Sequence, residues 1–183
     1  MRVFGRRAAG AAVVAVLVAG TGVARGGTAV ASVTTAAAAA GRVCLFDAPD
    51  GAMGLGHVGW AYRLADGSDW EYGATLQDHN WRRSGTEAQM LHDFATVNDS
   101  GGYRSYRCDD TAADDPGAAD AAATAGFARP YGLITDNCLT RSIEIFKAYD
   151  RSGGLNGLGD GRWMLPNAYF NYALPGWGPE TKL

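Results

Sequence analysis

The feature that most constrains the fold is a β-hairpin signal over residues 57–76. Two runs that alternate apolar and polar residues, 57–64 and 69–76, flank an Asp-Gly pair typical of a tight turn. Because side chains alternate along a strand, His57 shares a face with Gly59 and Ala61. The pattern therefore predicts a histidine at the start of a strand, on a face where another group can pack close to it.

A second local signal predicts an amphipathic helix that starts at Cys138. Asp136 and Asn137 are both good N-cap residues, and Leu139 and Ile143 follow at helical spacing. The free N–H groups and positive dipole end at a helix N-terminus stabilise a thiolate, and they can also bind an oxyanion. We therefore expect Cys138 to be a nucleophile with a lowered pKa, and Asp136 and Asn137 to build the helix start beside it.

The rest of the chain predicts an α+β fold, in which an antiparallel sheet packs against the helix that carries Cys138 at its N-terminus. The other expected elements are a strand at Val43–Phe46, a helix at Glu87–Ala95, a strand at Tyr103–Cys108, an acidic linker at Asp109–Asp115, a surface helix at Gly117–Phe127 and an aromatic C-terminal segment that packs on the core.

The start of the chain resembles a secretory signal peptide. A basic beginning precedes an apolar run at 8–24 and the small-residue motif Ala29-Val30-Ala31, although Gly22-Val23-Ala24 also fits a cleavage site. We expect a signal peptide at 1–31, a disordered tail at 32–41 and a single domain at 42–183. No other run approaches the roughly 20 apolar residues of a membrane span. The sequence therefore predicts a secreted protein without a stable membrane anchor.

The charge of the chain disfavours two classes of partner. Four of the 16 basic residues and none of the 19 acidic residues precede Ser32, so residues 32–183 carry a formal charge of −7. An acidic surface repels phosphate backbones and anionic lipids. We expect no nucleic-acid partner.

The cysteine count is odd, with Cys44, Cys108 and Cys138. In an exported protein two cysteines normally pair and one thiol remains. A disulfide between Cys44 and Cys108, which lie in two peripheral strands, is the favoured pairing and leaves Cys138 free. The alternatives are that Cys138 pairs with either of the others, or that it is a buried small apolar residue.

A cysteine nucleophile needs a base within hydrogen-bond reach, and histidine is the usual one. His79 lies in a polar loop and His92 inside a helix, where histidines mostly serve surface or packing roles, so His57 is the favoured base. No pair of histidines has the spacing of metal ligands on a helix or turn, so we expect neither a metal nor a cofactor.

Three motifs together resemble a known superfamily. Gly56-His57-Val58-Gly59-Trp60, followed by Glu71-Tyr72-Gly73-Ala74, is similar to the histidine hairpin of the NlpC-type cell-wall peptidases, which have a papain-like fold. Here the histidine precedes Asp136-Asn137-Cys138. That order is similar to the circularly permuted branch, which includes lecithin retinol acyltransferase and uncharacterised secreted actinobacterial proteins.

The resemblance implies a secreted amide or ester hydrolase, or an acyl transferase, with Cys138 as nucleophile and His57 as base. It also implies a peptide, peptidoglycan or other acyl substrate. A third residue usually orients the imidazole, and the strand after His57 offers Glu71, Tyr72 or Thr75. None of these is the usual His, Asn or Gln. A non-catalytic binding or structural protein, with an inactive Cys/His pair, is therefore the alternative.

Overall fold

Six antiparallel strands form one sheet within residues 40–183, the part of the chain that the computed structural model describes. The expected signal peptide and residues 32–39 of the expected tail lie outside it. The strands are β1 (Gly41–Ala48), β2 (His57–Arg63), β3 (Asp69–Thr75), β4 (Asn80–Thr86), β5 (Ser105–Thr111) and β6 (Thr181–Lys182). Their order in the sheet is β4-β3-β2-β1-β5-β6, which confirms the predicted α+β class with an antiparallel sheet.

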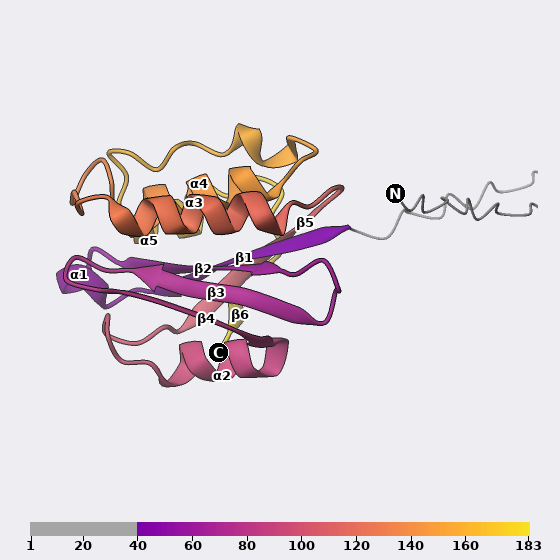
Figure 1. Cartoon of the computed structure of the whole chain (residues 1–183). Helices are drawn as coiled ribbons and strands as arrows, with labels where there is room; N and C mark the ends of the chain where they lie inside the picture. The colour runs from indigo at the N-terminus through magenta and orange to yellow at the C-terminus, as the bar shows by residue number, and fades with distance from the viewer. Residues whose placement is uncertain (1–39) are drawn as a thin grey trace, which may run out of the picture. The chain divides into compact units, whose positions relative to one another are not determined.

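Helices cover both faces of this sheet (Figure 1). Helices α3 (Pro116–Ala128), α4 (Cys138–Tyr149) and α5 (Pro166–Tyr172) lie on one face, and α2 (Glu87–Thr96) lies on the other. The single turns α1 (Gly51–Gly54) and η1 (Gly154–Gly157) belong to connecting loops. Alternation along each strand produces two cores: Val58, Trp60 and Tyr62 of β2 pack toward α4, whereas Ala61 packs toward α2.

The hairpin predicted from the sequence is confirmed. Strands β2 and β3 pair from Arg63↔Trp70 to Gly59↔Ala74, and the turn closes with Leu64 N–H donating to the carbonyl of Asp69 at 2.8 Å. His57 begins β2 but lies beyond the last β2–β3 pair. Its side chain therefore stands at the open end of the hairpin.

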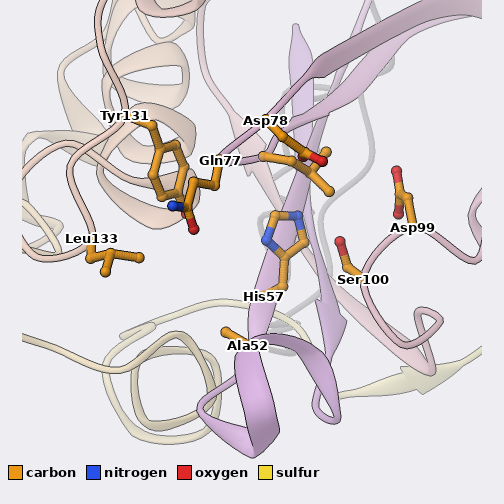
Figure 2. A pocket seen from close by; sticks show the side chains of 9 residues that line it. Ala52, His57, Gln77, Asp78, Asp99, Ser100, Tyr131 and Leu133 are labelled. Atoms are coloured by element: carbon orange, nitrogen blue, oxygen red, sulfur yellow. The ribbon is translucent and has the colours of Figure 1, made fainter.

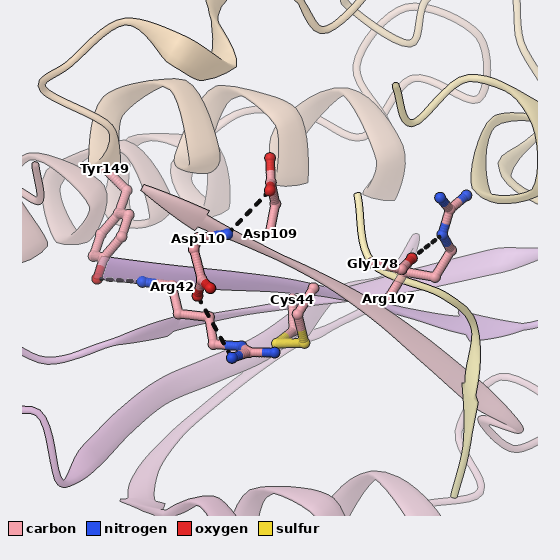
Figure 3. The surroundings of a disulfide bond; sticks show 8 residues. Arg42, Cys44, Arg107, Asp109, Asp110, Tyr149 and Gly178 are labelled. Atoms are coloured by element: carbon pink, nitrogen blue, oxygen red, sulfur yellow. Dashed lines mark hydrogen bonds and ion pairs between the residues drawn. A yellow bond between two sulfur atoms is a disulfide. The ribbon is translucent and has the colours of Figure 1, made fainter. Parts of the chain in front are cut away.

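Cys44 and Cys108 form a disulfide across the β1–β5 pair, in the register Cys44↔Cys108 (Figure 3). This is the pairing that the sequence favoured. The expectation that both strands are peripheral is wrong for β1, because β1 lies between β2 and β5 inside the sheet. The cross-link therefore joins a central strand to its neighbour.

Two segments differ from the elements expected between the hairpin and α3. Strand β4 was not predicted, because its Trp-Arg-Arg-Ser-Gly sequence has little apolar alternation and owes its pairing to β3. Strand β5 begins at Ser105 and runs to Thr111, so the first three residues of the expected acidic linker are paired with β1. Gly41 of the expected tail likewise belongs to β1.

The helical face also corrects two expectations. Helix α3 is not purely a surface helix, since Ala119, Ala123 and Gly126 are buried on the side that packs on α4. In the expected aromatic segment, residues 163–172, Tyr169 and Phe170 are buried, as expected, but the other bulky apolar residues of that segment are exposed (Trp163, Met164, Leu165 and Tyr172).

Arg107 on β5 holds residues 170–178 in place. Its guanidinium donates to the backbone carbonyls of Phe170, Leu174, Trp177 and Gly178 at 2.9–3.4 Å, and Figure 3 shows the last of these bonds.

Among residues 40–183, no helix has the length and apolar character needed to cross a membrane.

Candidate functional site

The side chain of Asn137 builds the start of α4. Its Oδ1 accepts hydrogen bonds from Leu139 N–H at 2.9 Å and Thr140 N–H at 3.1 Å, and the Thr140 hydroxyl accepts one from Asn137 N–H at 2.8 Å. This reciprocal cap satisfies backbone groups that a helix start leaves unpaired. Of the two residues expected at this helix start, Asn137 is therefore the N-cap.

Asp136 has a different role, because it pairs with arginines. Its carboxylate accepts a hydrogen bond from Arg141 Nε at 2.7 Å and two from Arg129 at 3.0 Å. Arg141 is only 2% exposed and also donates to the carbonyls of Arg129 and Pro130. A buried guanidinium with these partners fixes the segment before α4, which carries Tyr131.

The Cys138 thiol is buried and held in its neutral form. Burial raises its pKa, and hydrogen bonds from Val58 N–H, the Tyr131 hydroxyl and Leu139 N–H offset that effect only in part. The expectation of a lowered pKa from the helix start is therefore wrong for this structure. The desolvation of the thiol raises its pKa more than the helix end lowers it. In addition, the first-turn N–H groups of Leu139 and Thr140 are already bonded to Asn137.

His57 is buried at the start of β2, and its Nε2 has no hydrogen-bond partner within residues 40–183. Burial, and then the nearby charge of His79, lowers its pKa to about 4. Figure 2 shows its ring with Gln77 and Tyr131 on one side and Asp99 on the other. The imidazole is therefore neutral at physiological pH and available as a base.

Cys138 and His57 line the same cavity, which has a volume of about 380 Å³. Its walls come from the α1 loop, the segment before α4 and the segment before α5. His57 also lines a second, polar cavity of about 190 Å³ with Asp99 and Ser100. The structure thus brings the two main predicted site residues to one cavity, and the polar cavity adjoins it, since His57 lines both.

Glu71 and Tyr72 do not lie beside His57, which corrects their expected role in orienting the imidazole. Glu71 pairs with Arg82, and the Tyr72 hydroxyl donates to Asp93 at 2.8 Å. The β2–β3 register places them opposite Tyr62 and Ala61, toward the other end of the hairpin. Because β2 and β3 are antiparallel, only the end of β3 approaches His57, and Glu71 and Tyr72 lie three or more residues before that end.

Thr75, the other candidate on that strand, is the last residue of β3. Its buried hydroxyl has no hydrogen-bond partner within the described chain. It lines neither cavity. No contact of Thr75 with the imidazole supports it as the orienting residue.

Sequence reasoning missed three polar residues near His57. Gln77 and Tyr131 line both cavities, and Asp99 lines the polar one. Gln77 lies just after β3, so the hairpin register could have indicated it. Asp99 and Tyr131 lie in irregular loops, for which the sequence carries no comparable signal.

An apolar rim surrounds the mouth of the larger cavity. A shallower hollow of about 230 Å³ shares Leu133, Ile134, Met164 and Leu165 with it. Nine large apolar side chains of residues 40–183 are exposed, and seven of them line these two hollows. Such clustering marks a binding surface.

Residues with a strained backbone lie along the apolar rim. Within the described chain, three residues other than glycine have positive φ: Ala52 at 47°, Met53 at 62° and Trp163 at 63°. All three line one of the two hollows. Asn167 holds the α1 loop by donating to the carbonyls of Pro49 and Gly54 at 3.0 and 3.2 Å. Strained non-glycine residues persist where the surroundings hold them, and they cluster at functional sites.

The lowered pKa of His57 predicts a pH-dependent contribution to stability. The unfolded chain, with a histidine pKa near 6.5, binds the proton more readily than the folded protein, with a pKa of about 4. The contribution of His57 is therefore fully present above pH 6.5 and is lost as the pH falls toward 4, where we expect a loss of about 3 kcal/mol.

The measurement is the free energy of unfolding in urea of the wild type and of His57→Gln, each at pH 7 and pH 4. The comparison is needed because burial raises the pKa of Asp47 to about 6, with Glu180 adding to that effect, so Asp47 acts in the opposite direction over the same range. The free energy of unfolding of the wild type relative to His57→Gln is expected to fall by about 3 kcal/mol at the lower pH. An unchanged difference between the two proteins would mean that His57 titrates normally.

Within residues 40–183, no group of three or more His, Cys, Asp or Glu side chains is arranged to hold a metal ion. No protein-family model, no curated protein and no solved structure matches the chain.

Proposed function

We propose that the protein is a cysteine-dependent acyl hydrolase or acyl transferase, with Cys138 as nucleophile and His57 as base. One observation carries the proposal: the unpaired cysteine of residues 40–183 and a buried histidine line the same cavity. The order of the His57 hairpin before the Cys138 helix supports a circularly permuted papain-like arrangement. The disulfide supports a location outside the cytosol.

The neutral forms of both groups determine the order of proton transfer. Because burial favours the thiol and the imidazole, His57 takes the thiol proton as the sulfur attacks the acyl carbon. The imidazolium then gives this proton to the leaving alcohol or amine, and a thioester with Cys138 remains. Attack by water or by a second acceptor, again assisted by His57, releases the acyl group and restores the thiol.

Two hydrogen-bond donors next to the sulfur can stabilise the tetrahedral intermediate. The backbone N–H of Cys138 lies 3.3 Å from the Tyr131 hydroxyl oxygen, and that hydroxyl hydrogen-bonds the sulfur. Once the sulfur is bonded to carbon, both groups can turn to the oxyanion. The Tyr131 hydroxyl therefore shares with the Cys138 N–H the role that the sequence assigned to helix N–H groups alone.

The lining of the larger cavity favours an apolar acyl group. Its polar side chains are His57, Gln77, Tyr131, Asn137 and Cys138, and none of its lining residues is an Asp, Glu, Lys or Arg. Cell-wall peptides carry carboxylates and amines that need charged partners. A hydrocarbon acyl chain needs only the apolar rim, so an apolar ester, amide or thioester is the proposed substrate class.

This proposal predicts that turnover depends on acyl chain length. Hydrolysis of p-nitrophenyl acetate, butyrate and octanoate is expected to show kcat/KM rising along the series, since each fully buried methylene contributes about fourfold. Leu133→Asn should flatten the series, because Leu133 lines both hollows. Tyr172→Asn is the matched control, since Tyr172 is also a large exposed apolar residue but lines neither hollow. Highest activity on acetate, with no response to Leu133→Asn, would exclude an apolar acyl site.

A non-catalytic binding protein is the second candidate. It is favoured because Cys138 is only 2% exposed and because burial keeps both the thiol and the imidazole neutral. Mass spectrometry of the protein incubated with an octanoyl ester separates the two functions. The enzyme accumulates an acyl group on Cys138, whereas a binding protein holds the ester intact and unmodified.

A further inference from the structure

The polar cavity beside His57 contains an acidic residue that the proposed reaction has not used. Asp99 lies in the loop between α2 and β5 and lines this cavity of about 190 Å³ together with His57 and Ser100. Figure 2 shows Asp99 and Ser100 on the side of the His57 ring opposite Tyr131, with one ring nitrogen turned toward each side.

Three buried polar atoms beside this cavity have no hydrogen-bond partner in the described chain: His57 Nε2 and both carboxylate oxygens of Asp99. The Ser100 hydroxyl, by contrast, hydrogen-bonds to the Tyr103 hydroxyl. A buried polar group without a partner is costly, and native proteins contain few of them. A concentration of such atoms around one cavity indicates a shared polar function.

Neighbouring interactions place Asp99 close to His57. His79 Nε2 lies 3.9 Å from Asp99 Oδ2, and the charge of the same His79 acts on His57. The ring of Tyr103 lies 6.0 Å from that of His57, and Asp99 also acts electrostatically on Tyr103. His79 and Tyr103 thus each interact with both Asp99 and His57.

We infer that Asp99 is the positioning residue for His57: one water in the polar cavity accepts a hydrogen bond from Nε2–H of the imidazole and donates one to the Asp99 carboxylate. A water needs about 30 Å³ and at least two polar partners, and the cavity offers both. The contact fixes the proton on Nε2 and leaves the Nδ1 lone pair free on the side of Tyr131, whose hydroxyl lies next to Cys138. The orienting group therefore comes from a loop and not from the strand after His57.

The tautomer of His57 is directly measurable by NMR of the full chain labelled with ¹⁵N histidine, with signals assigned from His79→Gln and His92→Gln. The wild type is expected to show the Nε2–H tautomer of His57 alone. Asp99→Asn should give a mixture of tautomers, because its amide can donate as well as accept. Asp99→Glu should restore the single tautomer.

Asp78→Asn is the matched control. It removes the same charge from the same cavity, but Asp78 is 84% exposed and its carboxylate is hydrogen-bonded to His79. The His57 tautomer should remain unchanged in this variant. If Asp99→Asn also keeps the wild-type tautomer, Asp99 does not position His57 and the inference is wrong.

The catalytic consequence rests on the proposed function. With an octanoyl ester, Asp99→Asn is expected to lower kcat by at least about tenfold at unchanged KM, with recovery in Asp99→Glu. A merely structural role would lower the melting temperature and leave the tautomer unchanged. If the wild type shows no turnover, the proposed function fails while the NMR result still decides the role of Asp99.

Discussion

Cys138→Ala is expected to abolish turnover, with kcat falling on the order of 10⁴-fold or more, because no other thiol reaches the acyl carbon. The measurement is hydrolysis of the octanoyl ester, together with alkylation by iodoacetamide followed by mass spectrometry. The wild type should take up one label, at Cys138, and the variant none, since Cys44 and Cys108 are cross-linked. Alkylation should be slow in the native protein, since burial holds the thiol neutral.

Ser142→Ala is the matched control for this variant. Ser142 lies one turn further along α4, is fully buried and donates to the Cys138 carbonyl at 2.7 Å, but it lines neither cavity. The substitution changes the helix interior without changing the lining of the cavity. Activity should therefore stay within about twofold of wild type. Full activity in Cys138→Ala, or a disulfide that includes Cys138, would contradict the proposed nucleophile.

The double variant Cys44→Ala/Cys108→Ala is expected to lose about 4 kcal/mol of unfolding free energy. The cross-link spans a sequence separation of 64 residues, and the chain-entropy estimate for a loop of that length gives this magnitude. Urea unfolding checks the loss, and reduction of the wild type should reproduce it.

Cys138→Ala also serves as the control for this measurement, since it removes a buried cysteine without removing a cross-link. Its loss should be smaller than that of the double variant. A loss below about 1 kcal/mol in the double variant would contradict the chain-entropy estimate and would show that the disulfide restricts the unfolded chain little.

Elements with strong local signals could be predicted from the sequence. The hairpin of β2 and β3 follows from alternation and an Asp-Gly turn. The start of α2 follows from a cap residue, for which the sequence offers Ser84 or Thr86 and the structure uses Thr86. Strand β4 and the second half of β5 could not be predicted, because their residues are mostly polar and their pairing depends on β3 and β1. Neighbouring strands, and not local propensity, make these two segments extended.

The candidate site divides in the same way. Cys138 and His57 each carried a local signal, and the fold brings both to one cavity. The choice of Glu71 and Tyr72 as orienting residues is wrong because proximity in sequence does not give the position along the paired strand. Asp99 and Tyr131 reach His57 from distant loops, and no local pattern predicts such contacts.

By itself, the sequence determined the hairpin with His57 at its start, the capped helix that begins at Cys138 and the odd cysteine, because these depend on neighbours a few residues apart. Only the tertiary structure decided the protonation state of the thiol, the apolar rim and the polar cavity beside His57. Burial and through-space contacts set these properties, since desolvation of Cys138 outweighs the local effect of its helix end.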